Sequence, residues 1–275
     1  MKEINTEQTI AIRKQILKEF HAMCEKNKIK YSIGYGTLLG AVRHGGMIPW
    51  DDDIDVIVTR DDFEKLCKMY KSKNCKDKYQ FISHRNHPEI KTKIGYYIDF
   101  DTITETAYKK SSYHGVHIDV YPIDIVPNGI LQKKILLLRR KFLHILIRAK
   151  DVHPEVVKGK QKLIRQLILL ACSPFNYDKA IDKLHAISKK YANMPEKERK
   201  NVCIFVEAGA PVCFPYSVIK EYDQYKYDDN LYWGFKDYDC MLKSWYGDYM
   251  TPPPQNQRSI PEKKFVHYYY KDEAK

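Results

Sequence analysis

The chain has no CxxC pair among its seven cysteines, and their number is odd. Both features argue against a disulfide framework and a CxxC-type zinc site, and they favour reduced thiols in a cytoplasm. Long apolar runs are missing too. The longest uncharged stretch of the apolar middle runs from Gln166 to Tyr177 and is interrupted by Pro174, whereas a membrane-spanning helix needs roughly 20 residues. Residues 1–28 mix charged and apolar residues too closely for a signal peptide.

Glycine and proline number 12 and 13 of the 275 residues, too few for a collagen-like or wholly disordered chain. What the chain does have is a hydrophobic fraction of 44%, enough at this length to bury a sizeable core. It also carries a net charge of +12. Most of that charge lies in residues 131–165, where eleven basic residues face two acidic ones.

Hydrophobic periodicity gives the order of the elements. It predicts helices over 6–28, 38–43, 60–70 and 177–192, and strands over 31–35, 52–58, 79–83, 92–98, 104–108 and 116–123. This order predicts an α/β (α+β) fold with a mixed sheet and added helices. We expect a single domain over 1–275, with a core at about 20–128, a basic helical insert at about 129–200 and an aromatic-rich segment at about 201–260.

An acidic cluster lies at the start of the second predicted strand. Because side chains two apart on a strand point the same way, Asp53 and Asp55 share one face, and Ile54 and Val56 share the other. Like charges this close repel each other unless a cation neutralises them. Carboxylates are the preferred ligands of hard divalent cations, so the pair predicts bound Mg²⁺ or Mn²⁺. A solvated turn is the plainer interpretation of such a cluster.

A glycine-threonine step precedes this cluster, where a strand meets a helix. Gly36 lets the backbone approach a phosphate closely, and the amides near Thr37 at the helix start attract negative charge. A phosphate cradle beside paired carboxylates predicts a phosphoryl-transfer site. Arg43 and Lys93 are candidates for clamping phosphate, and an ordinary surface cation is an equal reading of each.

A third carboxylate comes from the strand predicted at 116–123. Asp119 is costly to bury without a partner, so we expect it to be either the third metal ligand or the base that takes a proton from an attacking hydroxyl. Asp124 lies near the predicted end of this strand, where a turn role is expected instead.

These motifs resemble those of a known family. GTLLGAVRHGGMIPWDDDIDV at 36–56, HIDVYPID at 117–124 and YGDYMTPPP at 246–254 are similar to the motifs of the LicD family, the phosphorylcholine transferases related to fukutin and fukutin-related protein. The resemblance also includes Lys93, Thr106 and Arg258, and covers about residues 20–260.

The resemblance implies a nucleotidyltransferase-like core with added helices. It also implies transfer of phosphocholine, or a related phospho-alcohol, from a CDP-activated donor such as CDP-choline to a hydroxyl of a cell-surface glycan such as teichoic acid, lipopolysaccharide or capsule, with release of CMP. By the resemblance, Asp53, Asp55 and Asp119 are the metal-binding carboxylates, and Gly36 and Thr37 form the phosphate-contacting turn. No zinc insert is expected.

Two further stretches have open interpretations. Ten aromatic residues lie within 222–249, and they either pack the core or surround the quaternary ammonium of choline. The basic segment 131–165 either packs on the core with a solvated face or docks on the inner face of a membrane that holds a lipid-linked glycan acceptor. The alternatives in function are a nucleotidyltransferase that adds NMP to a small molecule or RNA, and a non-catalytic glycan-binding relative. No RNA-binding module is evident, so nucleic acid is not the expected partner.

Overall fold

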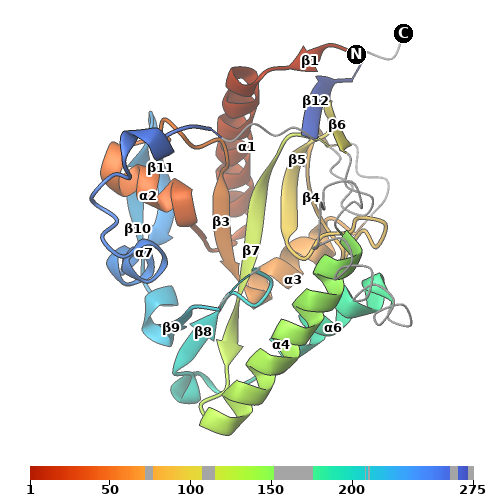
Figure 1. Ribbon diagram of the computed structural model, residues 1–275, viewed down its shortest axis with the longest axis vertical. Coiled ribbons are helices and arrows are strands. Elements are labelled where there is room, and N and C mark those ends of the chain that lie inside the picture. The colour runs from red at the N-terminus through yellow and green to blue at the C-terminus, as the bar shows by residue number, and fades with distance from the viewer. Residues whose placement is uncertain are drawn as a thin grey trace.

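The computed structural model describes residues 1–71, 77–106, 115–151, 176–207, 209, 211–260 and 266–271. Within these residues there are six α-helices (Figure 1). They are α1 (Thr6–Asn27), α2 (Tyr35–His44), α3 (Arg60–Met69), α4 (Ile130–Asp151), α6 (Tyr177–Lys189) and α7 (Tyr238–Tyr246). The mixed α/β fold expected from the sequence is confirmed.

The largest sheet is mixed and has seven strands. Five follow the order β2 (Tyr31–Ile33), β3 (Asp55–Thr59), β7 (His117–Val126), β5 (Gly95–Asp99) and β4 (Tyr79–Ser83). The end of β7 also pairs with β8 (Asn201–Cys203), which pairs with β9 (Cys213–Pro215). Only β3 and β7 are parallel, and all other described pairs are antiparallel. This parallel pair holds the predicted carboxylates.

Two smaller sheets complete the described strands. One is the hairpin of β10 (Tyr222–Tyr227) and β11 (Asn230–Phe235). The other joins β1 (Glu3–Ile4), β12 (Val266–Tyr270) and β6 (Thr102–Thr106), so that segments from both ends of the chain lie side by side at the top of Figure 1. Chain order alone gives no sign of this closure.

Local capping explains where the helices begin. Asn5 and Gln8 form a reciprocal capping box at the start of α1. Thr59 accepts a hydrogen bond from the Asp62 amide at the start of α3, as its spacing to Asp62 predicts. The helix α2 begins at Tyr35, three residues before the predicted start, and Gly36 and Thr37 therefore lie inside its first turn.

Both faces of the large sheet are buried. Val56 and Val58 of β3 pack in a core with α1, α2 and α3, and the alternate residue Ile57 packs in a second core with α4, α6 and β8. The sequence predicted only the first of these as a buried face. The second core therefore buries Ile57, which lies on the same face of β3 as Asp55.

Within the part of the chain that the structure describes, none of the helices combines the length and the apolar character needed to cross a bilayer.

Candidate active site

Two carboxylates stand side by side on the parallel strands. Asp55 of β3 is the register partner of Asp119 of β7, and the Asp119 amide donates to the Ile54 carbonyl at 2.9 Å. Neighbouring strands lie about 4.8 Å apart, so the two charges are close. Burial, together with the charges of Asp119, Asp53 and Asp51, raises the pKa of Asp55 well above its ordinary value. The pair therefore has the excess negative charge that a cation would offset.

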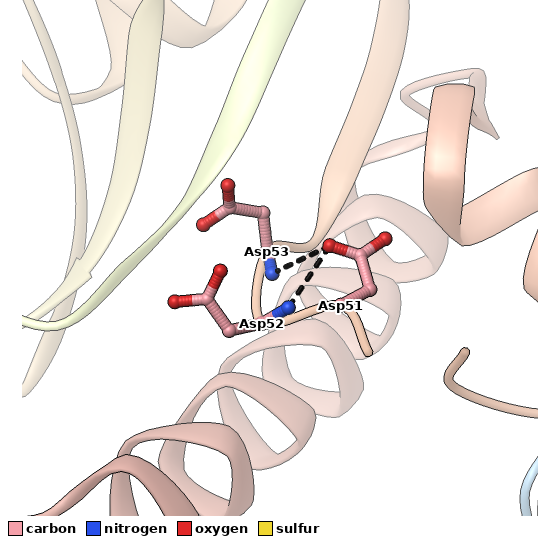
Figure 2. Close-up of side chains that lie close together, drawn as sticks. All are labelled: Asp51, Asp52 and Asp53. Atoms are coloured by element: carbon pink, nitrogen blue, oxygen red, sulfur yellow. Dashed lines mark hydrogen bonds between the residues drawn. The ribbon is translucent and has the colours of Figure 1, made fainter. Parts of the chain in front are cut away.

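The structure corrects the predicted start of β3. The strand begins at Asp55, so Asp53 lies in the preceding loop and not on the strand face that it was predicted to share. The reason is local: one carboxylate oxygen of Asp51 accepts hydrogen bonds from the amides of Asp52 (2.9 Å) and Asp53 (3.3 Å), which folds the chain into a turn (Figure 2).

This turn gathers acidic groups of its own. Asp51, Asp52 and Asp53 each place one carboxylate oxygen within 4.8 Å of the others, and they are the only such group of potential metal ligands found within the described residues. Figure 2 shows the carboxylates of Asp52 and Asp53 on one side of the loop and that of Asp51 turned away from them. Asp53 is the most exposed of the three. The acidic site thus extends from this loop to β3.

A buried arginine, which the sequence analysis missed, holds this loop. Arg13 of α1 is 2% exposed and lies 3.4 Å from Asp53 and 3.5 Å from Asp52. It also donates to the backbone carbonyls of Asp52 and His117 and to the Tyr268 hydroxyl. Burial alone would lower the pKa of Arg13, but the neighbouring Tyr268 and carboxylates raise it above its ordinary value. Arg13 therefore stays charged and offsets part of the acidic cluster.

The first turn of α2 supports the same carboxylates. Thr37 is buried, and its hydroxyl oxygen accepts a hydrogen bond from the Asp55 amide at 2.9 Å. A Cβ on Gly36 would lie 2.3 Å from a carboxylate oxygen of Asp51, so only glycine allows this approach. Tyr35, directly before, has a positive φ of 45°. Gly36 and Thr37 thus hold the acidic residues in place, and their contact with phosphate stays a prediction.

Arg43 and Lys93 were predicted as phosphate clamps, and Arg43 contacts groups outside the acidic cluster. Arg43 is in the last turn of α2, roughly 12 Å along the helix from Tyr35, and donates to the Tyr249 carbonyl at 2.6 Å. Both Arg43 and Arg258 approach the ring of Trp50, at 6.0 and 5.0 Å from its centroid. Lys93 lies toward α4, because its charge contributes to lowering the pKa of His144 there. A phosphate-clamping role for either cation stays a prediction.

Aromatic side chains from three elements surround the carboxylate pair. The Tyr35 hydroxyl donates to Glu207 at 2.7 Å, and the Tyr35 ring stacks on Trp245 of α7 at 4.3 Å. The Tyr121 hydroxyl donates to Asp119 at 3.3 Å. Burial and the charge of Asp55 raise the pKa of Tyr246. Of the aromatic stretch 222–249, the end formed by α7 therefore lies at the site.

Other aromatic residues of that stretch belong to the core. Tyr227 and Tyr232 are buried in the core beside α1, and Trp233 donates to Glu25 on the surface of α1. The core-packing interpretation is therefore confirmed for Tyr227 and Tyr232, and contact of the α7 aromatics with choline stays a prediction.

The turn role expected for Asp124 is wrong. The strand β7 continues to Val126, which places Asp124 within it and fully buried. Arg60 donates to both of its carboxylate oxygens, at 2.6 and 2.9 Å. Asp124 therefore forms a buried ion pair.

The paired carboxylates of β3 and β7 thus lie beside the first turn of α2, which carries the glycine-threonine step. Residues 28–155 match the LicD/FKTN/FKRP nucleotidyltransferase domain. This match agrees with the resemblance to the LicD family that the motifs carry.

Three relatives extend the comparison. The chain is 28% identical over 267 residues to the lipopolysaccharide cholinephosphotransferase LicD of Haemophilus influenzae, a match that covers 94% of this chain and 96% of the relative. It is 42% identical over 71 residues to an uncharacterized protein of Rickettsia typhi, covering 25% of this chain and 23% of the relative. A third match, 54% identical over 48 residues, is to an uncharacterized protein of Rickettsia prowazekii and covers 18% of each.

Proposed function

We propose that this chain transfers phosphocholine, or a related phospho-alcohol, from a CDP-activated donor to a hydroxyl of a cell-surface glycan and releases CMP. One observation carries the proposal: Asp55 and Asp119 lie in register at the parallel pair of strands, inside the segment that matches the LicD-family domain. The similarity over 94% of the chain to a lipopolysaccharide cholinephosphotransferase supports both the transferred group and the glycan acceptor.

We further propose that Asp53, Asp55 and Asp119 hold Mg²⁺ or Mn²⁺. The chemistry of the donor set fits a hard divalent cation, because all three ligands are carboxylates. Burial, and then the neighbouring carboxylates, raise the pKa of Asp55, and Arg13 opposes that rise only in part. When bound, the metal ion would stabilise negative charge on the diphosphate of the donor.

The residues of the chain supply the rest of the reaction. The acceptor oxygen bonds to the phosphorus of the phosphocholine group, and the bond from that phosphorus to the CMP oxygen breaks, so that CMP leaves with the electron pair. The proton of the acceptor goes to a carboxylate oxygen of Asp119 if that group acts as base, or to solvent if Asp119 is a ligand instead. Thr37, through the Asp55 amide, and Arg13, through Asp53, keep the carboxylates oriented.

One feature of the site supports a choline donor. A quaternary ammonium has no N–H donor, and aromatic rings with a carboxylate, such as Tyr35, Trp245 and Glu207, are groups that attract it. The acceptor glycan is proposed to be lipid-linked, with the protein in the cytoplasm and peripheral on the inner face of the membrane.

The test is donor turnover. Purified protein with Mg²⁺ and CDP-choline, CDP-ribitol or CDP-glycerol should release CMP from one of them in the presence of a glycan acceptor. The variants Asp53→Asn, Asp55→Asn and Asp119→Asn should each lower kcat/KM at least about a hundredfold, since each removes charge from the proposed metal site. Asp61→Asn, an exposed acid on α3, is the matched control and should keep wild-type turnover.

Other outcomes identify the alternatives. Pyrophosphate release from nucleoside triphosphates would indicate a nucleotidyltransferase. Glycan binding without turnover of any donor would indicate a non-catalytic relative. Wild-type turnover by Asp55→Asn would contradict the assignment of the site.

A further inference from the structure

Exposed apolar side chains gather on one helix. Eleven large hydrophobic residues are exposed within the described part of the chain, and six of them lie on α4: Ile130, Leu131, Ile135, Leu138, Phe142 and Ile145. From Leu131 to Ile145 they recur alternately four and three residues apart, which places them in one stripe along the helix. Leu131 is 71% exposed and Leu138 is 66% exposed. Apolar patches of this kind mark interaction surfaces.

The orientation of this stripe is set by the opposite side of α4. Leu136, Leu143 and Ile147 are buried in the second core. Arg140 is buried as well and donates to the carbonyls of Phe205, Glu207 and Gly209. A helix held by a buried arginine and several core residues does not rotate freely, so the exposed stripe is a fixed feature of the fold.

Positive charge borders the stripe on both sides. With 100° per residue, Lys134, Lys141 and Arg148 follow one border seven residues apart, and Arg139 lies on the other. No acidic residue occurs between Ile130 and Arg148. The surface is therefore apolar at its centre and cationic at its edges.

A groove between α4 and α6 continues this surface. It has a volume of about 680 Å³, and Leu138, Leu143 and Leu146 are among the residues that line it. Arg139, Lys179 and Lys183 also line it, the last two being one helical turn apart on α6. An apolar groove with cations is the shape and charge that suit an anionic amphiphile.

We infer that the stripe of α4 and the α4–α6 groove dock on an anionic lipid surface. Leu131, Ile135, Leu138 and Ile145 enter the boundary between headgroups and acyl chains, and Lys134, Lys141, Arg139 and Lys183 contact lipid phosphates. The inference rests on the proposed peripheral location, and it adds the surface and the lipid charge that provide it.

Two other occupants fit less well. A second copy packed on this stripe by two-fold symmetry would set the cationic borders against each other, with no acid from Ile130 to Arg148 to pair them. A nucleic acid would use the cations but leave the apolar stripe in water. Only a lipid surface uses both.

Docking by this face would also bring the candidate active site close to the membrane. Arg140 is on the side of α4 opposite the stripe and holds the Phe205–Glu207 segment, whose Glu207 accepts the Tyr35 hydroxyl bond. One helix diameter, about 10 Å, therefore separates that segment from the docking face. A lipid-linked acceptor at the surface is then within reach of the site.

The experiment is flotation of the full chain with vesicles. We expect the wild type to float with phosphatidylcholine vesicles that contain phosphatidylglycerol, and to bind pure phosphatidylcholine vesicles or anionic vesicles in high salt at least tenfold more weakly. Leu131→Ser with Leu138→Ser should weaken binding to anionic vesicles at least tenfold. Lys183→Gln should weaken it about fivefold, since each cation near such a surface contributes about one kcal/mol.

Matched variants separate this docking face from general surface effects. Leu138→Ser alone should weaken binding, whereas Leu231→Ser, a leucine 52% exposed on β11, should not. Lys68→Gln, an exposed lysine on α3, should likewise bind as the wild type does. Because the altered side chains are exposed, unfolding temperatures should stay unchanged.

Three results would overturn the inference. In the first, the wild-type protein does not float with anionic vesicles. In the second, the double leucine variant floats as well as the wild type. In the third, the wild type is a dimer, and Leu138→Ser dissociates it without changing vesicle binding. Turnover of CDP-choline with a water-soluble acceptor is measured in parallel. If the protein turns over the donor but does not bind vesicles, only this inference is contradicted. If it binds vesicles but turns over no donor, only the proposed function is contradicted.

Discussion

At the scale of single residues, Thr37 shows how the site is held by groups that carry no charge. Its hydroxyl oxygen accepts the Asp55 amide hydrogen bond, and it is buried at the start of α2. Thr37→Val keeps the shape and removes the acceptor, which leaves a buried amide without its partner. We expect kcat to fall about tenfold or more while KM for the donor changes less.

The conservative variant provides the control for Thr37. Thr37→Ser retains the hydroxyl and should recover most of kcat. Equal losses in the serine and valine variants would show that packing of the methyl group matters and the hydrogen bond does not.

The residue scale also shows what the sequence could reveal of the site. Alternation along the two strands was enough to select Asp55 and Asp119, and the structure places these two in register. Alternation did not place Asp53 correctly, because the turn at Asp51 keeps residues 51–53 out of the strand. Arg13 left a readable signal, since it shares a helix face with Ile16, Leu17 and Phe20. A cation on an apolar face points to a buried partner.

At the scale of elements, strand length was the weakest prediction. The strand β7 was expected to end at 123, with a turn role for Asp124, and it continues to Val126 because β8 pairs with its last residues. Such pairing joins segments some 75 positions apart in the chain, and local pattern carries no information on it. The helices α1 and α3, which are capped locally, were predicted to within about one residue.

The ion pair between α3 and β7 should dominate the attachment of that helix. Arg60 is 4% exposed and Asp124 is 0% exposed. Asp124→Asn would leave Arg60 charged in the interior without its carboxylate, and removing one partner of such a pair costs about 3–5 kcal/mol. We expect this decrease in the free energy of unfolding in urea titration. Asp61→Asn, exposed on the same helix, should change it by less than about 0.5 kcal/mol.

The attachment of α4 should depend on pH. His144 contacts the Phe205 carbonyl at 2.9 Å, and burial, with the charges of Arg140 and Lys93, lowers the pKa of His144 to about 4. Above pH 6.5 the imidazole is neutral in both the folded and unfolded chains, so it has no effect on the pH dependence. As pH falls from 6.5 toward 4, only the unfolded chain takes up the proton, and stability decreases.

Substitution separates this contribution from that of His185 on α6. His185, whose pKa is also lowered by burial, acts in the same direction. The variant His144→Gln should therefore show a smaller loss of stability between pH 6.5 and 4 than the wild type, with a remaining loss from His185. An unchanged pH profile in thermal unfolding would contradict the role of His144.

At the scale of the whole molecule, the candidate site lies where the two cores meet. Val56 and Val58 belong to one core and Ile57 to the other, and Asp55 precedes all three on the same strand. Elements from both cores thus reach the carboxylates: α1 through Arg13, α2 through Thr37, and the Phe205–Glu207 segment through Tyr35. Because these elements come from both cores, the residues that support the site are widely spaced in the chain. Movement of either core is therefore expected to alter the site.

The last strand provides the test at this scale. The strand β12 pairs with both β1 and β6, and its Tyr268 accepts a hydrogen bond from Arg13. A chain that ends at Ile260 therefore loses the pairing between its terminal segments and one partner of Arg13. We expect this truncated chain to unfold at a lower temperature and to turn over donor more slowly.

Tyr268→Phe should keep the stability nearly unchanged and lower turnover alone, because only the hydroxyl partner of Arg13 is removed. A chain that ends at Lys271 retains β12 and should match the full chain in both measurements. If truncation at Ile260 left turnover intact, Arg13 would not need Tyr268 to hold the acidic loop.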